Sequence, residues 1–224
     1  LNMSGAQAHI HHISELIKNP KLIFDFQGLV FPGGFSFGDE LGSGQVLALK
    51  IQNSFYHELL EASERGVAIL GICNGFQVLT RLGLLESEEH LKKRVRTLSL
   101  VHNRQGHFID RHVPLDVKKT SCWWTQSLEG STITLPIRHG EGRLVVSSSD
   151  SYDELKNNQR VVFCYKEDVN GSIDNIAGLT NLKGNILGMM PHPEAGFYQF
   201  HHEVGSERPL DFASGAQIFH SIVK

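Results

Sequence analysis

The chain has 224 residues, of which 40% are hydrophobic and 20% are charged, a composition that is ordinary for a soluble globular protein with one sizeable α/β domain. Its 21 basic and 24 acidic side chains give a formal net charge of −3 without any run of lysines or arginines, which argues against a nucleic-acid-binding surface as the main function. No stretch approaches the roughly 18 apolar residues that cross a bilayer, and three widely spaced cysteines indicate a reducing cytoplasmic location rather than a disulfide framework.

The first part of the chain alternates strand-like and helix-like segments. Residues 6–13 alternate apolar and polar side chains, which predicts a half-buried strand, and residues 29–31 predict a buried strand that ends at Pro32. From residue 43 to 65 the apolar positions recur every four residues and predict one amphipathic helix, ended by Gly66.

A fully apolar strand, residues 67–72, and a helix over residues 74–86 come next. This order, with strands that are apolar almost throughout, predicts an open, mostly parallel, twisted sheet with helices on both faces.

Short β-rich segments follow one another from about Val95 to Pro191 and add antiparallel strands to this α/β fold. Residues 181–185, Asn-Leu-Lys-Gly-Asn, predict a turn between the last two of them. The chain closes on an apolar helical stripe formed by Phe212, Ala216, Phe219 and Val223. No repeat or linker is present, so we expect a single domain over residues 1–224.

The segment Gly71-Ile72-Cys73-Asn74-Gly75 has the G-x-nucleophile-x-G form of a nucleophile elbow, between an apolar strand and a helix. At a helix N-terminus the dipole and the free N–H groups favour a negative charge on the sulfur. Burial as a packed core thiol is the usual fate of a cysteine. The two glycines favour the nucleophile at Cys73, whereas Cys122 and Cys164 lack this framing and are expected to serve packing.

A thiolate nucleophile needs a base, and the base needs an orienting partner. His192 lies between two prolines with Glu194 two residues on, where an extended backbone points both side chains the same way. The alternatives are a surface histidine in a proline-rich turn and a zinc site, but no HExxH or paired-cysteine spacing completes the latter. We expect five other histidines to be structural or to face solvent: His9, His11, His12, His201 and His202.

Gln77 follows Cys73 by four residues and therefore lies one helical turn away on the same face. Its amide could hydrogen-bond a small polar substrate held at the thiolate. An exposed polar helix residue is an equally good interpretation of this spacing alone.

Together these segments resemble the class I, triad-type glutamine amidotransferases, which have a flavodoxin-like fold. "FPGGFSFGDELGSG", "GICNGFQVLTRLGLL", "HGEGR" and "GNILGMMPHPE" are similar to one branch, the glutaminase subunits of phosphoribosylformylglycinamidine synthase in purine synthesis, from about Gly5 to Ala195. The resemblance implies that Cys73 attacks the carboxamide of glutamine, that His192 relays the proton and that Glu194 orients His192. Water then hydrolyses the glutamyl thioester to glutamate.

The resemblance also implies binding roles. The backbone N–H groups of Gly34 and Asn74 would form the oxyanion hole, and Gln77 with the backbone of His139-Gly140-Glu141 would hold glutamine. Glu141 and Arg143 would also face a partner. A glycine-rich turn is the alternative interpretation of "HGEGR".

Ammonia made by this family passes to an ATP-dependent synthetase subunit, which converts formylglycinamide ribonucleotide to the amidine, with a small bridging subunit in some organisms. The chain has no P-loop and no basic phosphate cluster. We therefore expect no cofactor or metal in this chain, with ATP and Mg²⁺ on the partner, and no nucleic acid or membrane among its partners.

The family normally begins with a strand and a helix before the segment that resembles "GAQAHIHHI". We expect the intact protein to carry roughly 20 more N-terminal residues, the length of a strand and a short helix; the alternative is that another chain fills their place. Rival functions are a glutaminase for another synthetase, a γ-glutamyl hydrolase and a non-catalytic regulatory subunit. The catalytic interpretation requires a Cys73 sulfur that is accessible and close to an imidazole.

Overall fold

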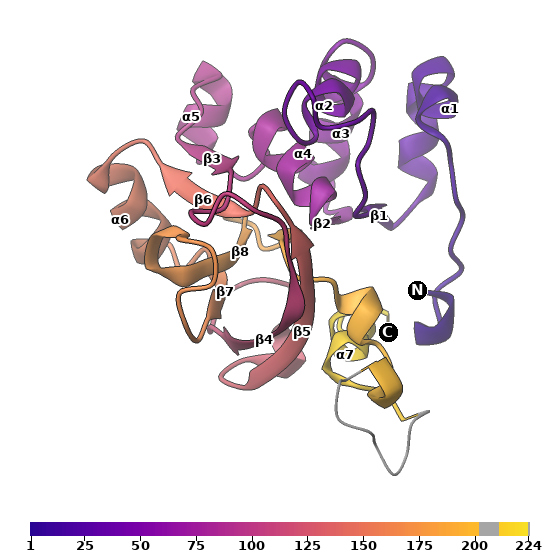
Figure 1. Cartoon of the computed structure of the whole chain (residues 1–224). Helices are drawn as coiled ribbons and strands as arrows, with labels where there is room; N and C mark the ends of the chain where they lie inside the picture. Colours follow the sequence, from indigo (N-terminus) through magenta and orange to yellow (C-terminus); the bar gives the residue numbers. More distant parts are fainter. Residues whose placement is uncertain (202–210, 224) are drawn as a thin grey trace.

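The computed structural model describes residues 1–201 and 211–223. A seven-stranded sheet in the order β1-β2-β9-β8-β7-β4-β5 forms its centre (Figure 1). The strands of this sheet are β1 (Gly28–Phe31), β2 (Ala68–Ile72), β4 (Ile109–Val117), β5 (Thr132–His139), β7 (Val161–Tyr165), β8 (Ile176–Thr180) and β9 (Ile186–Met189). A separate antiparallel ribbon pairs β3 (Leu98–Val101) with β6 (Arg143–Val146).

The two halves of the large sheet differ in strand direction. β2 pairs in parallel with β1 and with β9, whereas the pairs β9–β8, β8–β7, β7–β4 and β4–β5 are antiparallel. Every residue of β2 is buried because strands flank it on both sides and a helix covers it. The α/β fold class is confirmed, with antiparallel strands contributed by the second half of the chain.

Seven α-helices surround this sheet within the part of the chain that the structure describes. They are α1 (Ile13–Lys18), α2 (Gln45–Gln52), α3 (Tyr56–Glu64), α4 (Asn74–Leu82), α5 (Glu88–Lys93), α6 (Ser149–Asn157) and α7 (Ser214–His220). Short 3₁₀ segments span Asn2–Ser4, Pro20–Asp25, Gln126–Leu128, Ile173–Asn175, Pro193–Gly196 and Gln199–His201. α4 packs on β1, β2 and β9, and α7 packs against β5 at the opposite end of the molecule (Figure 1).

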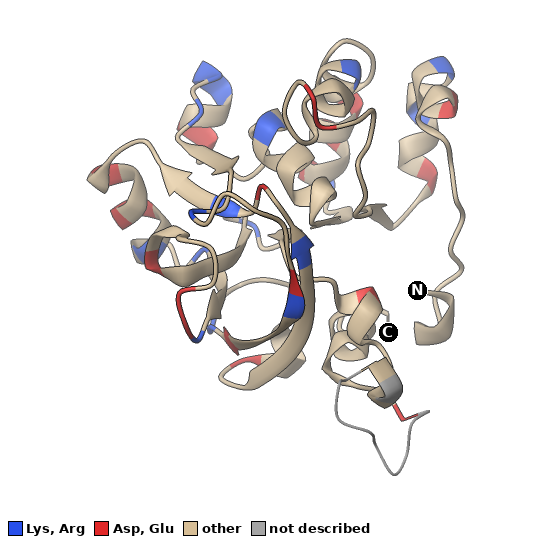
Figure 2. Cartoon of the chain, in the orientation of Figure 1, with Lys and Arg blue, Asp and Glu red and all other residues tan. Residues whose placement is uncertain are grey.

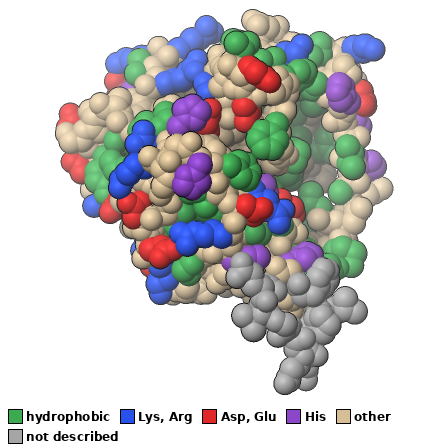
Figure 3. Space-filling view, viewed as in Figure 1, with side chains coloured by type: hydrophobic (Ala, Val, Ile, Leu, Met, Phe, Trp, Pro, Cys, Tyr) green, Lys and Arg blue, Asp and Glu red, His purple; other side chains and the backbone are tan. Residues whose placement is uncertain are grey.

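Charged side chains are distributed without a dominant sign. Basic and acidic side chains occur together on α1, α5 and α6 (Figure 2), and the face in Figure 3 mixes basic, acidic and histidine side chains. No described helix is both long enough and apolar enough to span a membrane.

Most of the predicted elements are present. The β-rich segments predicted from about Val95 to Pro191 form strands β3 to β9, and β8 and β9 pair across the predicted turn at residues 181–185. The C-terminal stripe forms α7, in which Ala216 and Phe219 are buried, although Phe212 lies before the helix and is half exposed. The helix predicted over residues 74–86 ends earlier, at Leu82, because Gly83 takes the left-handed conformation that ends helices.

The strand predicted at residues 6–13 is wrong. Residues 6–12 form no element, Ile10 is 99% exposed, and α1 begins at Ile13. His12 accepts a hydrogen bond from the Ser14 N–H, while the Glu15 carboxylate accepts one from the His12 N–H. This capping favours a helix start, and among the described residues no strand pairs with the alternating segment.

The single helix predicted over residues 43–65 is also wrong, because the chain breaks it into α2 and α3. Asn53 ends α2, and Phe55 has a non-helical backbone (φ −141°, ψ 27°) that precedes α3. Asparagine and serine favour caps and turns over helix interiors, and residues 53–54 are Asn-Ser. The break leaves both Ile51 and Phe55 buried.

Candidate active site

Cys73 occupies a sharp turn between β2 and α4. Its φ of +50° is unusual for a residue with a side chain, and it is the N-cap of α4. A Cβ at Gly75 would collide with the backbone carbonyl of Phe31, and one at Gly71 would meet Gly75 and Leu79. Only glycines fit at these two places, so the strand, turn and helix have the geometry of a nucleophile elbow.

His192 is brought to this turn from the far part of the chain. Its Nδ1–H donates to Glu194 Oε1 over 2.5 Å, and its backbone N–H donates to the Pro136 carbonyl over 2.8 Å. A Cβ on Gly33 would lie 2.7 Å from His192 Cε1 and 3.5 Å from Cys73 Cβ. Gly33 therefore lies between the imidazole and the cysteine, and its missing side chain lets them approach each other.

The surroundings of His192 favour its protonated form. Burial lowers the pKa of the ring, but the side chains of Cys73 and Glu194 raise it, with a net rise to about 9. Within the described residues, His192 Nε2 has no hydrogen-bond partner of ordinary geometry. Cys73 therefore raises the pKa of His192 because it lies close to the ring. An imidazolium between a carboxylate and a thiol is the arrangement that acid–base chemistry at sulfur requires.

The sulfur is close to an imidazole but is not open to solvent. Cys73 is only 6% exposed, and its Sγ–H donates to the Arg138 carbonyl over 3.5 Å. The expected accessibility is therefore absent in the free chain. The antiparallel strand β5, which carries Arg138, runs past the elbow and closes it from one side.

A chain of hydrogen bonds joins two loops to the first turn of α4 at the elbow. The Asn74 Oδ1 accepts from the Ser36 N–H and hydroxyl, and its Nδ2 donates to Gln77 Oε1 over 3.0 Å. Gln77 Nε2 in turn donates to the Glu141 carbonyl over 2.6 Å. Gln77 is thus a buried and bonded residue, not an exposed polar position, and Gly34 belongs to the loop that Ser36 anchors.

The segment His139-Gly140-Glu141 lies directly across from Gln77. His139 is 2% exposed and contacts Asn103 through Nδ1 at 3.0 Å, and the Gly140 carbonyl accepts from the Asn103 N–H. Burial and the nearby charge of His192 lower the pKa of His139 to about 4. The Glu141 carboxylate accepts from the Ser43 N–H, so its side chain also has a fixed place.

Several of these residues were not singled out by the sequence. Gly33, Ser36 and Ser43 lie within "FPGGFSFGDELGSG" but have no individual role assigned from it, and Asn103 lies in none of the quoted motifs. Their contacts join segments that are far apart in the chain, and no spacing rule gives such pairs. Arg143 lies at the start of β6, at the end of the "HGEGR" segment.

The other cysteines and histidines lie away from this arrangement. Cys122 is fully buried and Cys164 is half-buried, and burial raises the pKa of the Cys122 thiol to about 11. His12 caps α1 and His9 is exposed, whereas His202 lies outside the described residues. Across residues 1–201 and 211–223, no group of three or more histidine, cysteine, aspartate or glutamate side chains is placed to hold a metal ion.

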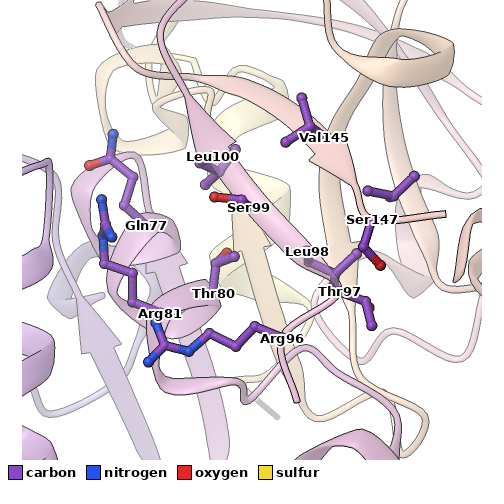
Figure 4. A pocket seen from close by; sticks show the side chains of 11 residues that line it. Gln77, Thr80, Arg81, Arg96, Thr97, Leu98, Ser99, Leu100, Val145 and Ser147 are labelled. Carbon is purple, nitrogen blue, oxygen red and sulfur yellow. The ribbon is translucent and has the colours of Figure 1, made fainter. Parts of the chain in front are cut away.

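A cavity of about 220 Å³ lies behind Gln77, between α4 and the β3–β6 ribbon (Figure 4). Gln77 and Arg81 border it from α4, and Arg96, Ser99 and Ser147 border it from the other side. Neither Cys73 nor His192 lines it. The cavity is thus separate from the buried sulfur, and Gln77 borders the cavity.

The class of protein follows from a comparison of the whole chain with known families. Residues 1–224 match the model of the CobB/CobQ-like glutamine amidotransferase domain, so the chain belongs to this family of enzymes. It is 38% identical over 217 residues to phosphoribosylformylglycinamidine synthase subunit PurQ of Treponema denticola, covering 87% of the chain and 80% of that protein. It is 43% identical over 174 residues to subunit PurQ of Trichormus variabilis, covering 77% and 71%. Within the glutamine amidotransferases, the chain belongs with the PurQ subunits.

Solved structures agree with this placement. The structure of PurLQS from Thermotoga maritima matches with a TM-score of 0.69 and 38% identity, over 88% of this chain and 79% of that one. The glutaminase domain of Trypanosoma brucei CTPS matches with a TM-score of 0.54 at 15% identity, over 97% of this chain and 80% of that one, and shows a shared fold.

Proposed function

We propose that this chain hydrolyses glutamine to glutamate and ammonia, and that the ammonia is used by a synthetase subunit to convert formylglycinamide ribonucleotide to the amidine in purine synthesis. The observation that carries the proposal is the elbow cysteine beside the His192–Glu194 pair in a chain of the glutamine amidotransferase family. The kinship with PurQ subunits supports the choice of synthetase.

In the first half of the reaction, the Cys73 sulfur attacks the carboxamide carbon of glutamine. The electron pair of the C=O bond moves to oxygen, where the N–H groups of Asn74 and Gly34 stabilise the charge. The first N–H groups of a helix have no acceptor inside that helix, so the Asn74 N–H at the start of α4 suits this role. As the C–N bond breaks, the His192 imidazolium gives its proton to the nitrogen and ammonia leaves.

In the second half, neutral His192 takes a proton from water, and the resulting hydroxide attacks the thioester carbon. The C–S bond breaks, glutamate forms, and the thiolate–imidazolium pair is restored. Glu194 keeps the Nδ1 proton of His192 in place throughout, which leaves Nε2 for these transfers. Thiol and imidazole complete this cycle without a metal or an organic cofactor in this chain.

Gln77 and residues 139–141 surround the place where glutamine would lie. Their hydrogen bonds hold the two walls at a fixed separation. Ammonia then requires an acceptor, which we assign to an ATP- and Mg²⁺-dependent synthetase subunit, with a small bridging subunit as a further partner. Docking of the synthetase subunit would open the buried elbow at Cys73.

The test is ammonia release from glutamine by the chain alone and in the presence of the synthetase subunit of the same organism. We expect slow ammonia release by the chain alone, because Cys73 is buried. In the complex we expect release to be at least about tenfold faster, because a modest shift of the loops toward an open conformation would have an effect of this size. Restoration of growth in purine-requiring cells that lack this subunit gives the second readout. Hydrolysis of γ-glutamyl folates without glutamine hydrolysis would assign the chain to a different reaction.

The pH profile of the reaction tests the role of Glu194. His192 has a raised pKa of about 9 and stays protonated below it, so kcat/KM should fall as the pH rises through about 9, where the proton for the leaving ammonia is lost. Glu194→Gln removes one of the interactions that raise this pKa and should move the fall to lower pH.

Glu89→Gln is the matched control, because Glu89 is an exposed glutamate on α5 that pairs only with Lys93 among the described residues. The upper limb of kcat/KM should not move in this variant. An unchanged limb in Glu194→Gln would remove Glu194 from the proposed role.

A further inference from the structure

Asn103 is a buried residue that hydrogen-bonds to the segment opposite Gln77, residues 139–142. It is 3% exposed and follows β3. Its backbone N–H donates to the Gly140 carbonyl over 2.8 Å, and its Nδ2 donates to the carbonyls of His139 and His107 over 2.8 and 3.0 Å. Its Oδ1 accepts from the Gly142 N–H over 3.2 Å. One side chain therefore satisfies backbone groups on both sides of the Glu141 carbonyl.

The same amide fixes the tautomer of His139. Because the backbone N–H of Gly142 can only donate and the His139 carbonyl can only accept, the positions of Asn103 Oδ1 and Nδ2 are determined. The contact of 3.0 Å between Asn103 Oδ1 and His139 Nδ1 then requires that Nδ1 carries the proton. Nε2 is left as a lone pair, buried and without a hydrogen-bond partner in the described part of the chain.

The backbone of His139 lies beside the elbow, because it follows Arg138, whose carbonyl accepts a hydrogen bond from Cys73 Sγ–H. Burial and the charge of His192 lower the pKa of His139 to about 4, so the ring is neutral. The ring of His139 packs on Gly142, where an added Cβ would collide with it. The histidine is therefore fixed by Asn103 at its Nδ1 atom and by the absence of a side chain at Gly142.

The other side of the segment is held through Gln77. The Glu141 carbonyl accepts from Gln77 Nε2, and Gln77 Oε1 accepts from Asn74, the residue after Cys73. Asn103 itself makes no hydrogen bond to Cys73 or His192 in the described structure. Its influence on the elbow must pass through residues 139–142 and Gln77.

We propose that Asn103 is a positioning residue for glutamine: it holds residues 139–142 in place and, through the Glu141 carbonyl, fixes Gln77 beside the substrate at Cys73. This inference rests on the proposed glutaminase function. It assigns Asn103 to substrate binding and not to the bond-breaking steps, because no acid or base in the reaction bonds to it.

Kinetics of the complex with the synthetase subunit test this role. Asn103→Ala should raise the KM for glutamine about tenfold or more, the effect of losing one well-made hydrogen bond to the bound state, and change kcat by less than about threefold. Gly142→Ala should raise KM in the same way, because its Cβ displaces His139 while Asn103 remains.

Asn185→Ala is the matched control. Asn185 is fully buried and donates to the carbonyls of Ser63 and Val67, far in the chain from this segment. It should lower the unfolding temperature without raising KM. If KM stays unchanged in both Asn103→Ala and Gly142→Ala, or rises equally in Asn185→Ala, the positioning role is overturned.

A readout without activity separates this inference from the proposed function. The imidazole ¹⁵N shifts of His139 should show a proton on Nδ1 in the wild type and a mixture of tautomers in Asn103→Ala, with faster amide exchange at Gly142. Identical spectra would overturn the inference even if the enzyme is active. Absence of glutamine hydrolysis in the wild-type complex would instead count against the proposed function, and the spectra would still decide the role of Asn103.

Discussion

Cys73→Ala should lower ammonia release from glutamine on the order of 10⁴-fold or more, the usual cost of removing a covalent nucleophile. Cys73 has the only cysteine side chain that lies beside His192 within the described structure, and its place at the start of α4 is set by the glycines of the elbow. Alanine keeps the small volume of the site, so the fold should persist. The measurement is the single-turnover rate of ammonia formation by the complex.

Cys164→Ala is the matched control for this change. Cys164 is a half-buried cysteine of β7, and its replacement should leave the rate within about twofold, as is usual for substitutions away from a reacting centre. A Cys73→Ala enzyme that releases ammonia at the rate of Cys164→Ala would exclude a covalent role for Cys73.

Gly75→Ala should have the largest effect on folding. The new Cβ would overlap the carbonyl of Phe31, the last residue of β1, whose backbone is paired with Gly71 of β2. Neither strand can yield without losing this pairing, so we expect a loss of about 3 kcal/mol or more in the free energy of unfolding. Urea unfolding followed by circular dichroism gives this quantity.

Gly28→Ala is the comparison, because Gly28 starts the same strand and its added Cβ would lie 3.6 Å from the Ala68 carbonyl oxygen, an ordinary contact. This change should cost less than about 1 kcal/mol. Equal costs for the two variants would show that α4 and β1 do not approach as closely as the elbow geometry requires.

The local features of the site could be predicted from the sequence because each is encoded within a few residues. The two glycines around Cys73 indicate the turn, and His192 and Glu194 form the expected hydrogen-bonded pair. The extended backbone expected for this pair is wrong, because Pro193–Gly196 forms a 3₁₀ segment. The apolar runs of β2 and β9 mark central strands because such strands are buried on both faces.

The remaining features depend on contacts between distant segments. Residues 6–12 alternate like a strand, but no strand in the described part of the chain pairs with them, and alternation alone cannot supply a partner. The Glu141 carbonyl reaches Gln77, and Gly142 reaches Asn103, only because the antiparallel strands carry residues 139–142 back to α4. The role of Gly33 likewise depends on its contact with His192, which is far from it in the chain.

The most direct measurement is mass spectrometry of the complex, quenched in acid during turnover of glutamine. We expect a glutamyl adduct on the peptide that contains Cys73, absent from Cys73→Ala and accumulating in wild type when deacylation is slower than acylation. Glu194→Gln should change the amount of this glutamyl adduct, because Glu194 orients the His192 ring that transfers the protons. An adduct on a different residue, or rapid ammonia release by Cys73→Ala with no adduct on any peptide, would contradict covalent catalysis at the elbow.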